Sequence, residues 1–232
     1  MKIIGSGFIA KNLSFNEKKF KNHVLYARGV SNSLCLNNSD FTKDKKLLVS
    51  TINKTKSDKI LVYISTCSIT DPSRKNKKYV KFKQELEKII IEKVKKYLIV
   101  RLPEVLGKNK NPHTVINFLM RKIKKSEKFN LWENASRNII DVSDVKKILL
   151  CFLINKHKNQ IINIANTKFY KITYIVQILE KILKKKAIFI EKKIGSSKWP
   201  VNLSKTKRSL KSSGIKFNKN YLERIIKKNL NN

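Results

Sequence analysis

Apolar residues are arranged along the chain in short uninterrupted runs that alternate with segments of helical periodicity. The runs predict strands at residues 2–5, 23–27, 59–65 and 97–102. From Tyr79 to Lys96 apolar side chains recur every three or four residues, which predicts an amphipathic helix. Uninterrupted apolar strands are typical of sheets buried on both faces. The pattern therefore predicts an α/β fold, with a parallel sheet and helices on both of its faces.

The later part of the chain predicts shorter, mixed elements. Helices are expected over residues 173–184 and 221–230, and strands over residues 161–164 and 187–190. Polar residues that can cap helices place two helix starts, at Asp40 and at Ser143. We expect a first domain over residues 1–165 and a small α/β lobe over residues 166–232, partly interleaved with it.

Glycines directly follow the first predicted strand, in the pattern Gly5-x-Gly7-x-x-Ala10. A strand, a glycine turn and a helix start are the setting in which backbone N–H groups approach a dinucleotide pyrophosphate. A plain glycine turn is the alternative, because the pattern alone is weak. Its position at the start of a strand–helix series favours a cofactor site.

A tyrosine and a lysine four residues apart, Tyr79 and Lys83, share one face of the predicted helix. An ammonium group near a phenol favours the phenolate and lowers the phenol's pKa, so that the phenol can exchange a proton with a substrate. Lysine is so frequent here that the spacing could also mark a solvated helix start. The preceding strand ends in hydroxyls, including Thr66, at the strand end where open α/β sheets place reacting groups.

The chain is strongly basic, with 53 Lys and Arg against 16 Asp and Glu and a formal charge of +37. Only seven of the 53 are Arg, and the lysines are spread over the whole sequence. Proteins that bind nucleic acid specifically usually depend on Arg for bidentate contacts to bases and phosphates. The low Arg content therefore leads us to expect no specific nucleic-acid binding. The excess is typical of drift in an AT-rich coding sequence, with a selected anionic partner as the alternative.

Neither membrane insertion nor metal binding is indicated. No apolar run approaches the ~18 residues that span a bilayer, and the first residues do not form a secretory signal. Cys35, Cys67 and Cys151 have no metal-ligand spacing and make no even-numbered framework. We therefore expect a cytoplasmic protein without a metal site.

Taken in order, the motifs resemble those of extended short-chain dehydrogenase/reductases, specifically the NAD-dependent epimerase/dehydratase type that modifies nucleotide sugars. The resemblance covers nearly the whole chain. It rests on the glycine turn, on Val62 to Thr66, on the Tyr79–Lys83 pair with Glu87, on Val100 to Gly107, on Arg137 to Val145, on Asn163 to Ala165 and on Asn202 to Lys205. It implies a Rossmann-like sheet and a nucleotide-sugar substrate, with a homodimer as an open possibility.

The resemblance also implies roles for individual residues. Thr66 would hold the substrate hydroxyl or carbonyl, Tyr79 would be the acid/base, and Lys83 would bind the nicotinamide ribose and tune Tyr79. The cofactor, NAD or NADP, would lie against Gly5, Gly7, Phe8, Ile9, Ala27, Gly29 and Lys83. Arg137 and Asn117 would bind the substrate.

Two departures from the family pattern change the expectation. The family has two further strand–helix units before the strand that ends in Ala27, so the sheet should be shortened and lack the acid that binds the adenosine ribose. Family dehydratases carry a carboxylate pair just after the catalytic Thr, where this chain has Cys67 and Ser68. We therefore expect an NAD(P)-dependent epimerase or reductase of a nucleotide-linked sugar, not a dehydratase, that serves surface polysaccharide synthesis. The alternative is a catalytically impaired binding protein that uses its basic surface on nucleic acid, membrane or an acidic partner.

Overall fold

The computed structural model describes residues 1–30, 33, 35–109, 111–195 and 198–230. The chain forms two compact units. The first contains Met1–Pro103, Val142–Ile164 and Pro200–Ile215, and the second contains Glu104–Asp141, Ala165–Trp199 and Lys216–Asn232.

A five-stranded, fully parallel sheet organises the first unit, with strand order β1-β2-β3-β4-β9. The strands are β1 (Lys2–Ile4), β2 (His23–Tyr26), β3 (Ile60–Thr66), β4 (Tyr97–Leu102) and β9 (Gln160–Asn163). In β3, at the centre, every residue except Ile64 is buried. The four apolar runs that opened the sequence analysis are thus confirmed as neighbouring strands, and the strand predicted at 161–164 joins them at the far edge.

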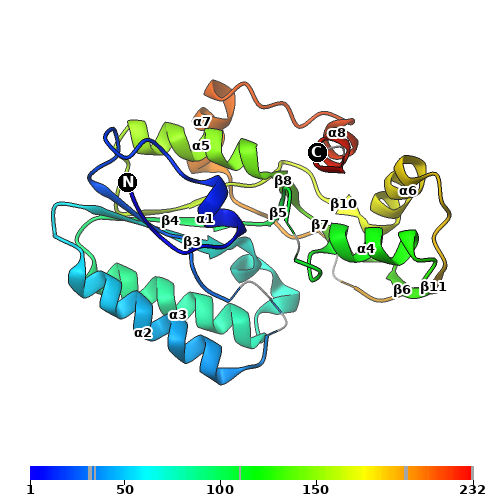
Figure 1. Ribbon diagram of the computed structural model, residues 1–232, viewed down its shortest axis with the longest axis horizontal. Coiled ribbons are helices and arrows are strands. Elements are labelled where there is room, and N and C mark those ends of the chain that lie inside the picture. The colour runs from blue at the N-terminus through cyan, green and yellow to red at the C-terminus, as the bar shows by residue number, and fades with distance from the viewer. Residues whose placement is uncertain (31–32, 34, 110, 196–197, 231–232) are drawn as a thin grey trace. The chain divides into compact units, whose positions relative to one another are not determined.

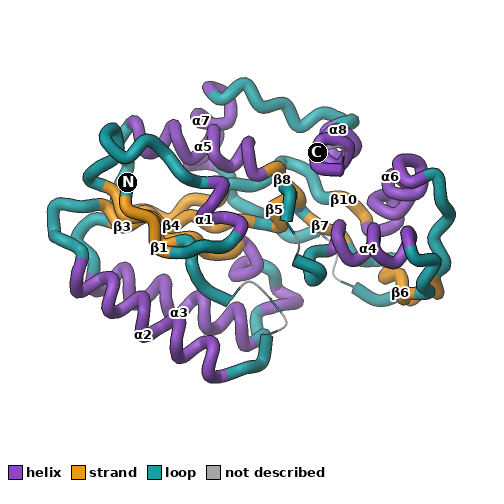
Figure 2. Tube along the Cα trace, in the orientation of Figure 1, coloured by secondary structure: helices purple, strands orange, loops and turns teal. Residues whose placement is uncertain are grey.

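Helices cover both faces of this sheet (Figure 1). On one face lie α2 (Asn38–Lys54) and α3 (Lys78–Lys93), and on the other lie α1 (Phe8–Asn12), α5 (Val142–Ile154) and α7 (Lys207–Ser212). Figure 2 shows the strands of the sheet in orange between these purple helices. Short 3₁₀ turns occupy Cys67–Thr70, Pro72–Arg74 and Ser204–Thr206. Leu48 of α2 and Leu86 of α3 are fully buried against Tyr26 and Tyr63 of the sheet.

The sheet is shortened at its first edge, as the sequence predicts. Strand β1 pairs only with β2, and residues 13–22, which link α1 to β2, contain no strand. The two strand–helix units that a longer sheet would carry beyond β1 are therefore missing from the described part of the chain.

The second unit is built from three two-stranded pairs and three helices. Strand β5 (Glu104–Leu106) runs parallel to β8 (Ile139–Asp141), β6 (Phe129–Trp132) parallel to β11 (Phe189–Lys192), and β7 (Ser136–Arg137) antiparallel to β10 (Tyr170–Lys171). The helices are α4 (Val115–Lys124), α6 (Ile172–Leu183) and α8 (Tyr221–Leu230). They share one apolar core with these strands.

A buried carboxylate fixes α8 onto β8. Asp141 is 1% exposed, and its Oδ1 and Oδ2 accept hydrogen bonds from Lys228 (2.9 Å) and Asn229 (3.0 Å). Its backbone N–H donates to the Tyr221 hydroxyl at 3.0 Å. The last helix is therefore held by buried polar groups as well as by its apolar face.

Some predicted boundaries are wrong, because hydrophobic periodicity locates a helix better than its ends. The cap of α2 is Asn37, whose side chain accepts from the Ser39 N–H at 2.9 Å, and Asp40 lies in the first turn. Ser143 lies inside α5, which begins at Val142. The strand predicted at 187–190 is β11, two residues later, where Phe189 pairs with Phe129 of β6.

Among the described residues, no helix is both long and apolar enough to cross a membrane.

The turn after β1 packs directly on the end of β2. Gly5 has a φ of +131°, and a Cβ at this position would lie 2.6 Å from the Ala27 carbonyl oxygen. The Ala27 N–H donates to the Ile4 carbonyl at 2.9 Å. Gly7, two residues on, has an ordinary φ of −77°, and a Cβ there would meet nothing within 4 Å. The two glycines of the motif therefore serve different purposes.

We predict that Gly5→Ala destabilises the protein by ~2 kcal/mol or more, because it combines a strained φ with a clash against backbone. Gly7→Ala should change the free energy of unfolding by less than ~1 kcal/mol. Urea unfolding of both variants measures the difference. Equal losses in the two variants would contradict this account of the turn.

Candidate active site

Three of the residues singled out from the sequence lie where strands of the first unit end. Gly5 follows β1, Ala27 follows β2, and Thr66 is the last residue of β3. Because the strands are parallel and adjacent, their carboxyl ends lie along one edge of the sheet. This edge is where open α/β sheets bind ligands.

Thr66 and Tyr79 meet at this edge. Thr66 is 8% exposed, and its Oγ1 accepts from the Ser68 N–H at 3.1 Å, which starts the 3₁₀ turn after β3. Tyr79, in the first turn of α3, is partly buried, and its phenol lies near enough to the Thr66 side chain for that hydroxyl to influence its ionisation. The structure therefore joins two residues that are thirteen positions apart.

Burial controls the ionisation of Tyr79. Burial raises the pKa of Tyr79 to about 12, although the hydrogen bond from Thr66 and the charge of Arg74 favour the phenolate. The negative charge of Asp44 raises this pKa further. The lowered phenol pKa that the sequence suggested is therefore wrong for this structure, because loss of solvent outweighs the favourable neighbours.

Lys83 lies one turn further along α3 and is 4% exposed. Among the described residues it is the one buried lysine. Its Nζ donates to the Tyr63 hydroxyl at 3.0 Å and lies 5.0 Å from the centre of the Tyr63 ring. Burial lowers the pKa of Lys83, while the charges of Asp44 and Glu87 raise it. Lysine is frequent in this chain, which suggested a solvated helix residue, but Lys83 is buried and hydrogen-bonded.

A partly buried ion pair links α3 to these strands. Arg101 of β4 donates to both carboxylate oxygens of Glu87, at 3.0 and 2.6 Å, and Ser65 Oγ donates to Glu87 Oε1 at 2.5 Å. Glu87 and Ser65 are both at most 5% exposed. Helix α3 is thus tied to the ends of β3 and β4, which fixes where Lys83 and Tyr79 can lie.

The proposed cofactor residues leave room for a ligand on the glycine side. Gly7 precedes α1 with open space at its Cβ position, and Phe8 and Ile9 form the partly buried first turn of that helix. Gly29 has a φ of +134° and packs against Asp44 and Lys83. These features fit the close backbone approach that a dinucleotide requires. Strand β1 is the edge strand, so within the described residues no further strand lies beyond it whose terminal acid could bind the adenosine ribose.

The two proposed substrate residues belong to the second unit. Arg137, in β7, donates from Nη1 to the Ser136 carbonyl at 2.9 Å. Asn117, in the first turn of α4, donates from Nδ2 to the Asn111 carbonyl (2.8 Å) and to Asn109 (3.1 and 3.2 Å). The structure thus brings Thr66, Tyr79 and Lys83 together in the first unit, whereas Asn117 organises a loop of the second.

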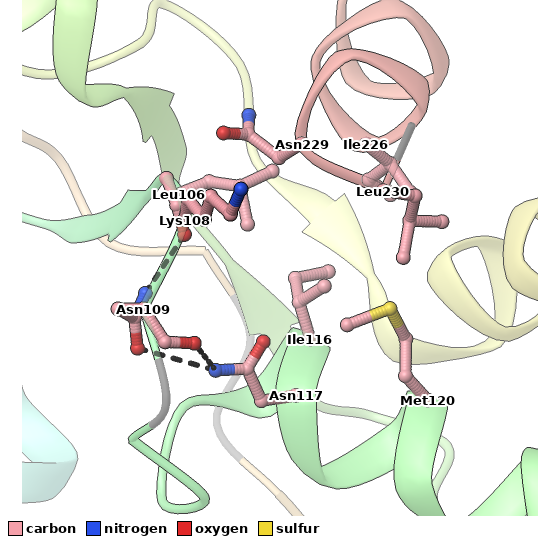
Figure 3. Close-up of a pocket in the computed structure, with 10 residues that line it drawn as sticks. Leu106, Lys108, Asn109, Ile116, Asn117, Met120, Ile226, Asn229 and Leu230 are labelled. Carbon is pink, nitrogen blue, oxygen red and sulfur yellow. Dashed lines mark hydrogen bonds between the residues drawn. The ribbon is translucent and has the colours of Figure 1, made fainter. Parts of the chain in front are cut away.

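Asn117 borders a cavity of about 100 Å³. Figure 3 shows its side chain turned toward Asn109, with Ile116 and Met120 on the same helix and Ile226 and Leu230 on α8.

Within the described ranges, no group of three or more His, Cys, Asp or Glu is placed to hold a metal ion.

Two functional-site neighbours, Asp44 and Tyr63, carry no signal in the sequence. Asp44 stands between lysines on a helix whose polar face looks solvated, and Tyr63 lies inside an apolar strand. Both are buried beside Lys83 in the structure. Only the packing of α2 against α3 and the sheet reveals them.

Comparisons with known proteins show which folds and which family this chain resembles. Solved structures with a similar fold include UDP-glucuronic acid 4-epimerase from Bacillus cereus in complex with UDP-glucuronic acid and NAD. That structure has a TM-score of 0.71 and 16% identity, over 90% of this chain and 74% of that chain. MoeE5 in complex with UDP-glucose and NAD has a TM-score of 0.69 and 11% identity, over 88% and 77%. RMD from Pseudomonas aeruginosa complexed with NADPH has a TM-score of 0.67 and 14% identity, over 90% and 81%. No curated protein sequence matches the chain.

The model of one family, described as "NAD dependent epimerase/dehydratase family", matches residues 36–165. The match spans more than half of the chain and includes Thr66, Tyr79, Lys83, Asn117 and Arg137. It starts after the glycine turn and Gly29. By this match, the chain belongs to the NAD-dependent epimerase/dehydratase family.

Proposed function

We propose that this protein is an NAD(P)-dependent epimerase or reductase that acts on a nucleotide-linked sugar. The observation that carries the proposal is the meeting of the Thr66 and Tyr79 side chains at the carboxyl end of β3, with the buried Lys83 one helical turn away. Family membership supports it. So do fold neighbours whose structures contain UDP-sugars with NAD, or NADPH.

In this mechanism Tyr79 moves the proton. With its pKa raised to about 12 by burial, Tyr79 is protonated at neutral pH and starts as a proton donor. It would donate to the carbonyl oxygen of a keto-sugar that is being reduced, and the phenolate would take the proton back from a hydroxyl that is being oxidised. Thr66 would hold that same oxygen by a hydrogen bond.

A bound nicotinamide cofactor would give a hydride to a keto-sugar in a reduction, and in an epimerisation it would first accept a hydride from the carbinol and then return it. The residues proposed to hold it are Gly5, Gly7, Phe8, Ile9, Ala27, Gly29 and Lys83. Lys83 would donate to the ribose hydroxyls. Arg137 would pair its guanidinium with the substrate diphosphate, a match of planar donors to phosphate oxygens, and Asn117 is the second proposed substrate contact.

The chemistry of the turn after Thr66 supports hydride transfer without dehydration. Burial raises the pKa of the Cys67 thiol to about 12, and its Sγ lies 3.4 Å from the Arg101 carbonyl. Asp71 is 2% exposed and accepts from the N–H and the hydroxyl of Ser73, at 3.0 and 2.7 Å. The nearest acid in sequence is therefore engaged in its own turn, and neither residue is placed as a second acid/base.

A role in surface polysaccharide synthesis, a cytoplasmic location and a homodimeric state belong to the same proposal. The alternative is a binding protein that has lost cofactor turnover. The position of β1 at the sheet edge favours that alternative, because the adenosine side of the site has no strand beyond it.

The first test is dinucleotide binding and turnover. We predict that calorimetry detects binding of NAD(H) or NADP(H), and that Tyr79→Phe lowers turnover of a nucleotide sugar by ~10²–10⁴-fold while dinucleotide affinity stays unchanged. The phenyl ring keeps the packing and removes the proton.

Tyr97→Phe is the matched control, since Tyr97 lies at the start of β4, away from Thr66. Full activity in Tyr79→Phe would reject the acid/base assignment. If the wild-type protein binds no dinucleotide, the binding-protein alternative is favoured instead.

The pH dependence follows from the raised pKa of Tyr79. Below that pKa the phenolate fraction grows tenfold per pH unit, so the rate of sugar oxidation should rise about tenfold per unit between about pH 6 and pH 8. Reduction, which uses the protonated phenol, should stay level over the same range. Stopped-flow rates in both directions measure this, and a level oxidation rate would show that ligand binding has lowered the pKa of Tyr79.

Dehydration should not occur. With NAD and a panel of nucleotide hexoses, we predict that no 4-keto-6-deoxy product accumulates, because Cys67 and Ser68 supply no carboxylic acid. Mass spectrometry of the products checks this. Accumulation of such a product, abolished in Thr66→Val, would contradict the interpretation of Cys67 and Ser68.

A further inference from the structure

Asp44 is a buried acid on α2 with one uncommitted oxygen. It is 4% exposed, and the Tyr26 hydroxyl donates to its Oδ1 at 2.8 Å and contacts its backbone carbonyl at 3.2 Å. Its Oδ2 is also buried and has no hydrogen-bond partner. A buried carboxylate oxygen without a donor is costly unless a positive charge lies near.

That oxygen points to the same place as the Lys83 ammonium. A Cβ built on Gly29 would lie 2.5 Å from Asp44 Oδ2 and 3.3 Å from Lys83 Nζ. The carboxylate and the ammonium therefore both lie next to Gly29, which follows β2. No ion pair joins them among the described residues, but they lie within the ~4–6 Å over which opposite charges stabilise each other. A Cβ at residue 29 would clash with the Asp44 carboxylate, and the φ of +134° there also favours glycine.

The other charges near Lys83 are already paired. Glu87, on the same helix, accepts hydrogen bonds from Nε and Nη2 of Arg101 and from Ser65. From β3 the neutral Tyr63 hydroxyl and the Ile64 carbonyl face Lys83, at 3.0 and 3.5 Å. Tyr79 lies one turn back on α3. Asp44 is thus the anion whose charge is left to balance Lys83.

We propose that Asp44 is a positioning residue that keeps Lys83 charged and fixed beside Gly29, one of the proposed cofactor residues. The inference rests on the proposed function for its catalytic meaning, since Lys83 is the proposed ribose contact. It assigns to α2 a task that no motif of the sequence marks. Asp44 itself touches neither substrate nor cofactor in this proposal.

The direction of the effect on ionisation follows from the charges. Burial lowers the pKa of Lys83, and Asp44 raises it. Neutralising Asp44 should therefore lower the Lys83 pKa further, so that the ammonium is lost at a lower pH. The same carboxylate raises the pKa of Tyr63 and of Tyr79, so both phenols should also titrate earlier without it.

The decisive experiment follows the Lys83 ammonium directly. In the full chain labelled with ¹⁵N at lysine Nζ, the Lys83 signal is assigned by its loss in Lys83→Met and then titrated by NMR. In Asp44→Asn we expect its midpoint to fall by about one pH unit or more, a tenfold or greater change in proton affinity. Asp40→Asn, the same change at an exposed position of the same helix, should leave the midpoint unchanged. An unchanged midpoint in Asp44→Asn overturns the proposal.

Kinetics separates this inference from the proposed function. In Asp44→Asn the loss of activity at high pH should move to lower pH by the same amount as the Lys83 midpoint, and the KM for the dinucleotide should rise. A purely structural role would lower stability and leave the pH profile in place. If the wild-type protein shows neither binding nor turnover, the proposed function fails while the titration still decides the charge balance.

A second variant keeps the test valid if Asp44→Asn folds poorly. In the Lys83→Met background the ammonium is absent, so Asp44→Asn should cost less stability than in the wild type, or increase stability. Urea unfolding of the four proteins measures this difference. Equal costs in the two backgrounds, or failure of both Asp44 variants to fold, would show that the carboxylate serves the fold alone and would overturn the proposal.

Discussion

The pairing of β3 with β2 on one side and β4 on the other is the constraint on which the rest of the first unit depends. Leu25 of β2 and Leu98 of β4 both pair with Val62, and helices cover the sheet above and below. A strand enclosed in this way has almost no polar side chains until it ends. The hydroxyls of Ser65 and Thr66 come at that end, where they meet α3. The location of the candidate site is therefore a consequence of how the sheet is buried.

The strongly basic composition of the chain does not extend to the charged groups around Lys83. The chain carries a formal charge of +37, yet its one buried lysine within the described ranges, Lys83, lies among acids. Glu87 is paired with Arg101, and Asp44 has an oxygen free of hydrogen bonds. Two acids and two bases thus share the interior near the strand ends. A buried charge is tolerated only with such compensation, so the lysine-rich composition says little about the site.

The five-stranded sheet of the first unit begins with β1, close to the glycine turn. Strand β1 is an edge strand, and the family match begins at residue 36, beyond the glycine turn. Gly5 nevertheless packs directly against the Ala27 backbone, whereas the Cβ position of Gly7 faces open space. The glycine turn and the Thr66–Tyr79 contact therefore lie at the carboxyl ends of β1 and β3, on the same side of the sheet.

The sequence by itself determined the strands of the five-stranded sheet and most of the helices, and it singled out Thr66, Tyr79 and Lys83 as candidates, because hydrophobic periodicity and short motifs are local properties. It did not mark the short strands of the second unit. It could not determine that Tyr79 has a raised pKa, since that depends on how much solvent the fold removes around the phenol. Asp44 was likewise invisible, because a carboxylate between lysines looks solvated until α2 packs on α3. The tertiary structure also decided that residues 104–141 join the chain's last helix in one core. Burial and the pairing of distant charges arise only when segments far apart in sequence come together, and no local pattern records them.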